Sequence, residues 1–421
     1  MFKSFNQVDK YFNERQNIGI KPGLNRVFFL LQRVNHPEKE IHGIHVAGTN
    51  GKGSTIEMIQ SVLVAHHYRV GVFTSPSFSG LTGHCMISGE EVTEKEFTFL
   101  VNELLPHIDA LDKRGDAPTV FEILTVLAFM YFKGKTDIVL IETGMGGRYD
   151  TTNCFIPLIS VITTVHYDHM QFLGSDLEDI ASHKAGVMKE KRPLVLGNVS
   201  EEVRQVIDQE RKALNVPIYE YGKQFSLYND RITVPEINKV INIAGLRLQG
   251  HHQKENAAIV VMILALLEDN GFAIDWDCVE KYIEHTTLPG RFEVIHKEPT
   301  IILDSAHNIA GVEALKQTII SMNLRTKKQL LFAGFSDKQL QEMMNRLQPL
   351  FDSIWLTTFD HERAANEREY KEQQMAYPFI NQWQEKVLQM IKDTSSTTYV
   401  ITGSLHFITL VRNFILKQKN I

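Results

Sequence analysis

The sequence has few of the features that mark secreted, membrane-spanning or disulfide-stabilised proteins. Its 421 residues include only three cysteines, Cys85, Cys154 and Cys278, which are odd in number and form no C-x-x-C pair. This usage predicts a reducing compartment. The longest apolar run, Ala257 to Leu267, is too short to cross a bilayer.

The net charge and the first residues of the chain exclude further classes of protein. The net charge is −6 and no long basic run is present, which argues against nucleic acid or an anionic membrane as a partner. The start, "MFKSFNQVDKYFNERQ", lacks the apolar segment of a secretory signal. We therefore expect a cytoplasmic protein of two or three domains, with a monomer as the starting hypothesis.

Short apolar strands alternate with helical patterns through the first half of the chain. Strands are expected within 41–48, 69–76, 136–144 and 157–165, which predicts an α/β fold with a mostly parallel, doubly wound sheet. The polar clusters "GTNGKGST", "TSPS", "ETGMGGRYDTTN" and "VHYDHMQFLG" follow these strands. Ligands bind beyond the carboxyl ends of such strands, so a site is expected there.

The pattern changes after the first half. Residues 219–249 favour a small antiparallel excursion, and 251–271 favour a long helix. The chain restarts near Pro289 with a second series of strands and helices. We expect an N-terminal domain, 1–289, and a smaller C-terminal Rossmann-like α/β domain, 290–421.

The segment "HVAGTNGKGST", His45–Thr55, has the features of a phosphate-binding loop. A strand leads into a glycine-rich turn, and the helix that follows offers its positive dipole end to an anion. In the common G-x-x-x-x-G-K-[ST] loop the hydroxyl directly follows lysine, whereas here Gly53 intervenes. The expected nucleotide contacts are Thr49, Asn50, Gly51, Lys52, Gly53 and Ser54.

Two other interpretations of this loop fit the sequence less well. It could be an ordinary glycine-rich turn with a surface lysine, but strand, glycines, lysine, hydroxyls and helix all occur in order. A signalling GTPase would add an N-K-x-D motif, and "NKVI" lacks the aspartate.

The wording of this loop resembles that of the ATP-dependent Mur-type amide ligases, most of all the folylpolyglutamate synthase/dihydrofolate synthase branch. The resemblance extends over nearly the whole chain, through motifs in the family's order. They are "IETGMGGRYDTTN" (141–153), "DHMQFLG" (168–174), "HKAGVMK" (183–189), "GHHQKENAA" (250–258), "PGRFEVI" (289–295) and "ILDSAHN" (302–308).

This resemblance implies a reaction and an architecture. ATP would phosphorylate a folate or dihydropteroate carboxylate, and the amine of L-glutamate would then displace phosphate from the acyl phosphate. It also implies an N-terminal Mur-ligase-type ATP-binding domain and a C-terminal domain that closes over the substrates.

The resemblance further implies two Mg²⁺ sites. The metal ligands would be Ser75, Glu142 and His169, with Ser54 near the nucleotide's metal. Glu142 ends a buried strand, where a carboxylate is costly unless it is paired or binds a metal, and oxygen ligands suit Mg²⁺. The alternative for His169 is an ordinary capping or core histidine.

Lys184 in "HKAGVMK" is the unusual residue. The resemblance implies that it is carbamylated and acts in catalysis with Lys52 and His307. A lysine whose pKa is lowered by burial can react with CO₂. The alternative is a solvated helix lysine that pairs with an acid one turn away.

Four further residues are implied around ATP by the resemblance: Asn256, Arg291, Asp304 and His307. Arg291 offers a planar fork to phosphate. Asp304 could instead cap the helix expected from residue 309.

The expected folate side consists of Lys21, Pro22, Gly23, Thr119, Phe121 and Tyr149. Phe121 offers a stacking face, or it belongs to the core. One segment departs from the family pattern, because residues 81–85, "LTGHC", replace a family stretch that carries an acid and an arginine. Ser305 also replaces a glycine.

Three hypotheses follow. The chain is a folate–glutamate ligase, a Mur-type ligase for another carboxylate, or a nucleotide-binding relative without turnover. The altered segment motivates the second, and retention of the whole metal set argues against the third.

Overall fold

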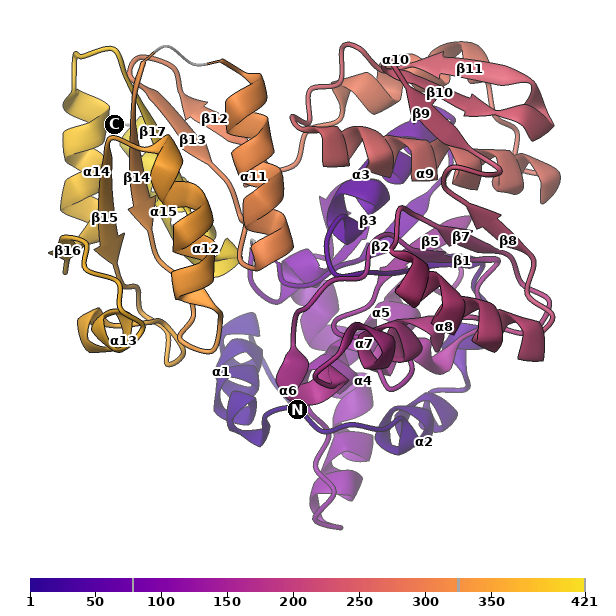
Figure 1. Ribbon diagram of the computed structural model, residues 1–421. Coiled ribbons are helices and arrows are strands. Elements are labelled where there is room, and N and C mark those ends of the chain that lie inside the picture. The colour runs from indigo at the N-terminus through magenta and orange to yellow at the C-terminus, as the bar shows by residue number, and fades with distance from the viewer. Residues whose placement is uncertain (78, 324–325, 420–421) are drawn as a thin grey trace. The chain divides into compact units, whose positions relative to one another are not determined.

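The computed structural model describes residues 1–77, 79–323 and 326–419. The chain divides into two compact units (Figure 1). The first comprises Met1–Gly245 and Lys254–His285, and the second comprises Leu246–Gln253 and the chain from Thr286 onward.

The first unit is built on an eight-stranded sheet in the order β4-β3-β2-β5-β1-β6-β7-β8. The strands are β1 (Gly43–Ala47), β2 (Val70–Phe73), β3 (Cys85–Ile87), β4 (Glu90–Glu91), β5 (Ile138–Glu142), β6 (Ile159–Ile162), β7 (Leu194–Leu196) and β8 (Ile218–Glu220). Among the strands that the structure describes in this sheet, only β3 and β4, at one edge, run antiparallel to their neighbours. The prediction of a mostly parallel sheet is therefore confirmed.

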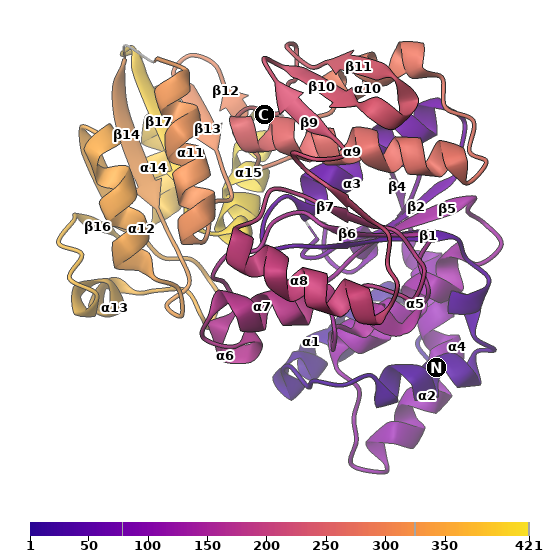
Figure 2. The ribbon, with the colours of Figure 1, turned by 45° about the vertical axis from the view of Figure 1, so that its right-hand side comes forward.

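Helices cover both faces of this sheet, with α3 and α9 on one face and α5, α7 and α8 on the other (Figure 2). Because α5 and most of α9 are apolar around their circumference, they bury most of their side chains. The helices are α1 (Phe5–Arg15), α2 (Asn25–Arg33), α3 (Lys52–Ala65), α4 (Glu94–Asp112), α5 (Val120–Phe132), α6 (Met170–Leu173), α7 (Leu177–Ala185), α8 (Glu201–Ala213), α9 (His251–Asp269) and α10 (Trp276–His285).

A three-stranded antiparallel sheet is formed by β9 (Ser226–Tyr228), β10 (Arg231–Val234) and β11 (Lys239–Asn242). This excursion begins later than the predicted residue 219, because Ile218–Glu220 pairs in parallel with β7 as the last strand of the large sheet.

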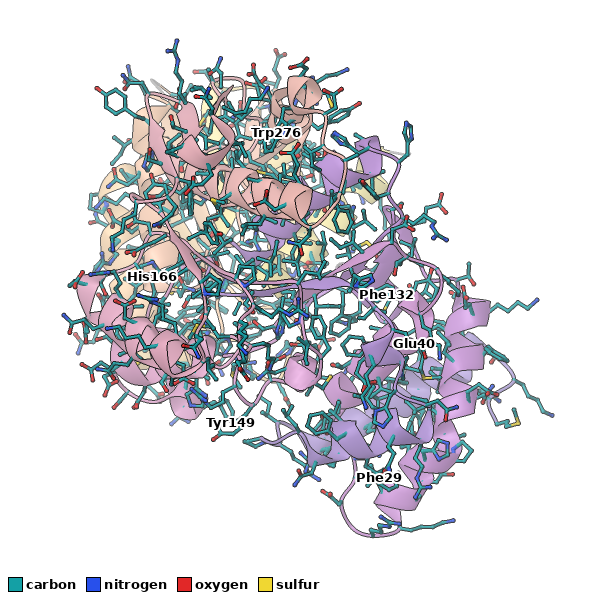
Figure 3. The ribbon with its side chains drawn as sticks, turned by 90° about the vertical axis from the view of Figure 1, so that its right-hand side faces the viewer. Phe29, Glu40, Phe132, Tyr149, His166 and Trp276 are labelled. Atoms are coloured by element: carbon teal, nitrogen blue, oxygen red, sulfur yellow. The ribbon has the colours of Figure 1, made fainter. Side chains whose placement is uncertain are left out.

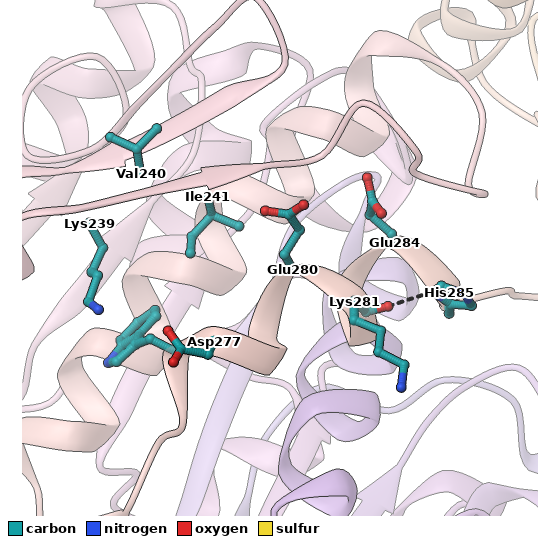
Figure 4. A pocket seen from close by; sticks show the side chains of 9 residues that line it. Lys239, Val240, Ile241, Asp277, Glu280, Lys281, Glu284 and His285 are labelled. Carbon is teal, nitrogen blue, oxygen red and sulfur yellow. Dashed lines mark hydrogen bonds between the residues drawn. The ribbon is translucent and has the colours of Figure 1, made fainter.

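Helix α10, which the sequence pattern did not indicate, packs beside β11. The two elements enclose a groove of about 490 Å³ (Figure 4). Glu280 accepts a hydrogen bond from the backbone N–H of Asn242, and Glu284 accepts one from that of Gly245. These carboxylates therefore fasten the end of β11 to α10.

The second unit has a six-stranded sheet in the order β12-β13-β17-β14-β15-β16, parallel except for β12. Its strands are β12 (Glu293–His296), β13 (Thr300–Leu303), β14 (Lys327–Phe332), β15 (Ser353–Thr357), β16 (Phe379–Ile380) and β17 (Thr397–Thr402). Its helices are α11 (Ile309–Ser321), α12 (Leu340–Leu347), α13 (Glu367–Glu372), α14 (Trp383–Lys392) and α15 (Leu405–Lys419). The expected second α/β domain is thus observed as a unit with its own core.

We propose that the two units correspond to the domains 1–289 and 290–421 expected from the sequence. In the part of the chain that the structure describes, no helix is long and apolar enough to span a membrane.

Candidate active site

The turn between β1 and α3 has a shape that only glycine permits at two positions. Gly48 has φ +154°, and a Cβ there would lie 1.9 Å from Thr163 Oγ1. Gly51 has φ +90°, and its Cβ would lie 2.5 Å from Oδ1 of the buried Asn256. Side chains at either position would collide with a neighbour in a backbone conformation that they rarely adopt. The glycines of the motif thus set the shape of the loop.

The first half of the loop is fastened to the chain that follows β6. The backbone N–H of Thr49 donates to Thr164 O (2.8 Å), and that of Asn50 donates to Thr164 Oγ1 (3.0 Å). The Thr49 hydroxyl donates to His166 O (3.1 Å) and accepts from its N–H (3.0 Å). Thr49 and Asn50 therefore shape the loop, and their N–H groups are engaged by protein.

The second half of the loop opens α3. The helix begins at Lys52 without a side-chain cap, so its N-terminal dipole end can favour an anion. Lys52 Nζ donates to Gly48 O (3.0 Å). Ser54 and Thr55 are buried, and among the described residues Thr55 Oγ1 has no hydrogen-bond partner. Thr55 was not among the predicted contacts.

Glu142 lies at the carboxyl end of β5 and is only 5% exposed. Its Oε2 accepts from the Thr74 hydroxyl and from the Ser75 N–H (3.3 Å), and its Oε1 lies 3.9 Å from Lys52 Nζ. The ends of the neighbouring strands β1, β5 and β2 thus bring Lys52, Glu142 and Ser75 together. This places a carboxylate, a hydroxyl-bearing residue and an ammonium group beside the loop.

His169, just before α6, differs from this group in its backbone conformation and in the exposure of its side chain. It has φ +51°, its side chain is 40% exposed, and its Nε2 lies 3.9 Å from Oδ2 of the buried Asp168. Within the described ranges, no three His, Cys, Asp or Glu side chains converge as a metal site. The alternative of a core histidine is wrong, because the imidazole is exposed. His169 does occupy the N-cap position of α6, but in the part of the chain that the structure describes its side chain forms no capping hydrogen bond there. The role of ligand stays a prediction.

Lys184, on α7, is only 3% exposed. Burial, and then the positive charge of Lys52, lower its pKa to about 7, although Asp168 and Asp150 oppose this change. Among the described residues, Lys184 Nζ donates no hydrogen bond. The alternative of a solvated lysine paired along its helix is wrong, because the side chain is buried.

A buried polar network that the sequence reasoning missed lies beside β1. His45 Nε2 lies 2.8 Å from Thr152 Oγ1, and Thr152 donates through both its N–H and its hydroxyl to Asp150. Asp150 also accepts from Met145 N (2.8 Å). Burial raises the pKa of Asp150, and these hydrogen bonds oppose the shift. A polar residue in an otherwise apolar strand, "IHVA", was the available signal.

The two predicted folate-side segments lie together. Arg26 Nε donates to both carboxylate oxygens of the buried Glu122 (2.9 and 3.1 Å). Lys21 Nζ donates to Ala117 O (3.0 Å). Thr119 is the N-cap of α5 and forms a capping box with Glu122. Its hydroxyl is thus engaged with the helix, which is a structural reason for a hydroxyl at this position.

Gly23 and Tyr149 present open surface. Gly23 has φ +107°, and a Cβ there would contact no atom; Pro22 precedes it. Tyr149 is 55% exposed (Figure 3), and its ring meets the edge of His183 at 5.7 Å.

Phe121 is half-buried. Its ring stacks on Phe73 at 5.6 Å and 26°, and it fills the space that a side chain at Gly144 would need. It packs at the edge of the core beneath the strand ends, and its role as a stacking face stays a prediction.

The segment that departs from the family pattern is tied to the end of β2. Residues Thr82–His84 form a helical turn that leads into β3. His84 Nδ1 donates to Thr74 O (2.7 Å), and the Thr74 N–H donates back to His84 O (3.1 Å). Phe78 lies outside the described residues. His84 thus holds the residue next to Ser75.

In the second unit, Asp304 follows β13 and accepts from the N–H groups of Phe292 and Ala306, both at 2.9 Å. Burial raises its pKa, and the charge of Arg291 opposes the shift. The N-cap of α11 is Asn308. The alternative of Asp304 as the cap is therefore wrong.

Two histidines interact with this pair electrostatically, His307 with Asp304 and His252 with Arg291. His307 Nδ1 donates to Ser305 O (2.9 Å), and among the described residues the buried Ser305 Oγ has no hydrogen-bond partner. His252, which was not predicted, has its pKa lowered to about 4 by burial and then by Arg291. Arg291, Asp304 and His307 thus belong to one electrostatic group within this unit.

Comparison with known families matches both parts of the chain. A family model for the Mur ligase middle domain matches residues 46–264, and one for the Mur ligase glutamate ligase domain matches residues 290–405. The chain therefore belongs to the Mur ligase family.

The names of individual relatives point to one branch of this family. The "Dihydrofolate synthase/folylpolyglutamate synthase" of Bacillus subtilis (strain 168) is 35% identical over 426 residues, which cover 98% of this chain and 99% of the relative. The structure of Escherichia coli FolC in complex with DHPP and ADP has a TM-score of 0.88 at 25% identity, covering 99% of each chain.

The Mycobacterium tuberculosis folylpolyglutamate synthase complexed with ADP and AMPPCP has a TM-score of 0.87 at 26% identity, covering 98% of each chain. The resemblance inferred from the motifs, the two-domain α/β fold and the prediction of an ATP-dependent ligase are confirmed.

Proposed function

We propose that the chain joins L-glutamate to the carboxylate of a folate or of dihydropteroate through an acyl phosphate. The observation that carries this proposal is the grouping of Lys52, Glu142 and Ser75 at neighbouring strand ends, with Glu142 Oε1 3.9 Å from Lys52 Nζ. A buried carboxylate and an ammonium group beside a phosphate loop suit the transfer of a phosphoryl group.

The proposed reaction has two steps, phosphorylation of the acceptor and formation of the amide. A carboxylate oxygen of the acceptor attacks the γ-phosphorus of ATP, and ADP leaves. The amine nitrogen of glutamate then attacks the acyl carbon, the C–O bond to phosphate breaks, and the amine loses a proton. Lys52 binds the negative charge of the transferred group, while the turn at Gly51 and the start of α3 position the nucleotide.

Mg²⁺ fits the residues at this place. The Glu142 carboxylate and the hydroxyls of Ser75 and Ser54 are oxygen ligands of the kind that Mg²⁺ prefers. When bound, the ion would neutralise phosphate charge. We propose these three residues for it, with His169 for a second ion.

Carbamylation of Lys184 is part of the proposal. The buried amine has its pKa lowered to about 7, so a large neutral fraction can attack CO₂ at neutral pH. The nitrogen forms a bond to carbon, one proton is released, and an anionic carbamate results. A negative group at this place would offset the charge of Lys52 and provide further oxygen ligands.

The remaining roles rest on the geometry of each unit. Asn256 buttresses the phosphate loop at Gly51. In the second unit, Arg291, Asp304 and His307 are proposed to bind nucleotide. For the acceptor, Lys21, Pro22, Gly23, Thr119, Phe121 and Tyr149 are proposed, and the contact between Arg26 and Glu122 supports their grouping.

We also propose a cytoplasmic monomer that uses small-molecule substrates and binds neither nucleic acid nor membrane. The three cysteines are free, which suits a reducing compartment. Sedimentation of the purified chain would test the monomer.

Acceptor choice is tested by turnover. The chain is incubated with ATP, Mg²⁺, L-glutamate and either dihydropteroate or tetrahydrofolate, and ADP and the glutamylated product are measured by mass spectrometry. Product with either acceptor supports the proposal. The altered segment 81–85 motivated another carboxylate as acceptor, but the named relatives favour folates. Absence of ADP release with both acceptors would overturn the folate assignment.

A further inference from the structure

A groove of about 850 Å³ lies in the second unit, between two strands and α14. Its floor is formed by Lys327 and Gln329 on β14 and by their parallel partners Thr397 and Tyr399 on β17. These residues begin their strands, whereas Asp304 follows the carboxyl end of β13, which runs parallel to β17. The groove therefore lies at the amino ends of the parallel strands, whereas the candidate nucleotide residue Asp304 lies at their carboxyl ends.

Three ammonium groups line the groove, those of Lys327, Lys386 and Lys392. Among the described residues, none of the three forms an ion pair with a carboxylate, in contrast to many other lysines of the chain, such as Lys371 with Glu367. Unpaired cations around one concavity create a positive potential that attracts anions.

The carboxylate in the lining, Asp393, is already engaged. It accepts from the Ser395 N–H (3.0 Å), the Ser395 hydroxyl (2.6 Å) and the Tyr399 hydroxyl (2.7 Å). These bonds, led by that from the Ser395 side chain, lower its pKa to about 2. Asp393 therefore stays charged and holds the connection before β17 in place, but one carboxylate does not balance three lysines.

Lys386 is held in an unusual state. Its Nζ lies 3.5 Å from the centroid of the Trp355 ring on β15, a cation–π contact. Burial lowers the pKa of this lysine. A partly desolvated ammonium without a carboxylate partner gains more from an entering anion than a fully hydrated one does.

We propose that this groove binds a small multivalent anion through the ammonium groups of Lys327, Lys386 and Lys392. Lysines act as point charges and do not impose the planar geometry of arginine, so phosphate and carboxylate groups suit them equally. Two kinds of molecule share this chemistry: phosphate-bearing small molecules and short chains of γ-linked glutamate. The site is distinct from the proposed active site and does not depend on its chemistry.

The test uses the full chain with Lys52→Gln as background, which weakens binding of phosphate at the loop. Inorganic tripolyphosphate and tri-γ-glutamate are titrated separately by calorimetry, and the probe that binds identifies the source of the anion. We expect saturable binding that weakens by about tenfold or more in Lys386→Gln/Lys392→Gln, the effect of losing charge-assisted contacts. The matched control is Lys371→Gln, which removes a paired lysine of the same unit and should leave the affinity unchanged.

A second measurement reports on the place of binding. Drawing Lys386 away from the indole should change tryptophan fluorescence, and the change should be lost in Trp355→Phe. Unaltered affinity in the double lysine variant, or binding of acetate as tight as that of both multivalent probes, would overturn the proposal. Saturable binding that these variants weaken, together with a Trp355-dependent fluorescence change, would support it.

Discussion

His45 Nε2 lies 2.8 Å from Thr152 Oγ1, and this contact joins the strand before the phosphate loop to the turn after β5. Because Thr152 donates its hydroxyl proton to Asp150, it must accept from His45, which fixes the histidine as the neutral tautomer with its proton on Nε2. This agrees with the pKa of His45, which burial lowers to about 3. The strand before the candidate phosphate loop and the turn that carries Tyr149 are thus connected by one hydrogen-bond chain.

Replacing Thr152 with valine tests this chain. The change keeps the shape of the side chain but leaves the buried His45 Nε2 without its hydrogen-bond partner and removes the hydroxyl donor to Asp150, which keeps its two backbone donors. We expect the free energy of unfolding to fall by about 1–3 kcal/mol, measured by urea denaturation of the ligand-free protein. The control is Thr143→Val, because among the described residues the buried Thr143 Oγ1 has no hydrogen-bond partner to lose. Equal losses in the two variants would contradict the network.

The pKa of Lys184 predicts a pH dependence of stability. In CO₂-free buffer its folded pKa of about 7 lies below the ordinary 10.5, so the unfolded chain binds more protons between these values. Stability should therefore rise with pH across that window. Lys184→Met should remove this part of the rise, measured as the free energy of unfolding near neutral pH and about two pH units higher. Identical pH profiles for the two proteins would refute the lowered pKa.

Carbamylation itself is tested spectroscopically. With ¹³C-bicarbonate, the native chain should show a carbamate carbon signal that Lys184→Arg lacks, since a guanidinium does not react in this way. Activity should fall in CO₂-depleted buffer and return on adding bicarbonate. A native signal that persists in Lys184→Arg would assign the carbamate elsewhere.

Glu142→Gln tests the proposed metal site. The amide keeps an oxygen for the Ser75 N–H but loses the charge, so the Mg²⁺ concentration needed for half-maximal turnover should rise. We expect turnover to fall by roughly 10–100-fold or more, as for other residues that support a bound metal. Glu38→Gln, at another buried carboxylate of the same unit, should leave the Mg²⁺ dependence unchanged. The same Mg²⁺ dependence in Glu142→Gln as in the parent would remove Glu142 from the site.

The close approach of Asn256 to Gly51 predicts the effect of adding a single methyl group at Gly51. In Gly51→Ala the Cβ would lie 2.5 Å from Asn256 Oδ1, so the loop must move and ADP affinity, measured by calorimetry, should fall by at least about tenfold. Gly134→Ala is matched in backbone strain, with φ +70° and no atom near the added Cβ. It should cost about 1–2 kcal/mol of stability and leave ADP binding intact. Native affinity in Gly51→Ala would contradict the role of the turn.

Local sequence patterns predicted the sheets of both units, because buried strands such as Ile138–Glu142 are apolar runs that end in polar residues. They missed α10, whose helix is amphipathic and largely polar. They also assigned Tyr219 to the antiparallel excursion, because a three-residue strand beside a turn has too little pattern to reveal its partner. The pairing of β8 with β7 is a tertiary contact.

The candidate site likewise contains residues that the sequence predicted and residues whose environment only the structure shows. The phosphate loop and Glu142 were visible because their chemistry is local to one strand end. Composition did not indicate the burial of Lys184, since "SHKAG" has the composition of a solvated helix; only the family resemblance implied it. The sequence left Asp304 open as an alternative cap of α11, because Asp and Asn are equally good caps and only the backbone geometry selects Asn308.

The acyl phosphate is tested most directly by isotope transfer. Acceptor labelled with ¹⁸O in its reacting carboxylate is turned over with ATP and L-glutamate, and the released inorganic phosphate is examined by ³¹P NMR. Attack of the carboxylate on ATP predicts that each phosphate carries one ¹⁸O from the acceptor, because the C–O bond breaks when glutamate attacks. Release of unlabelled phosphate alongside glutamylated product would contradict activation of the carboxylate by phosphorylation.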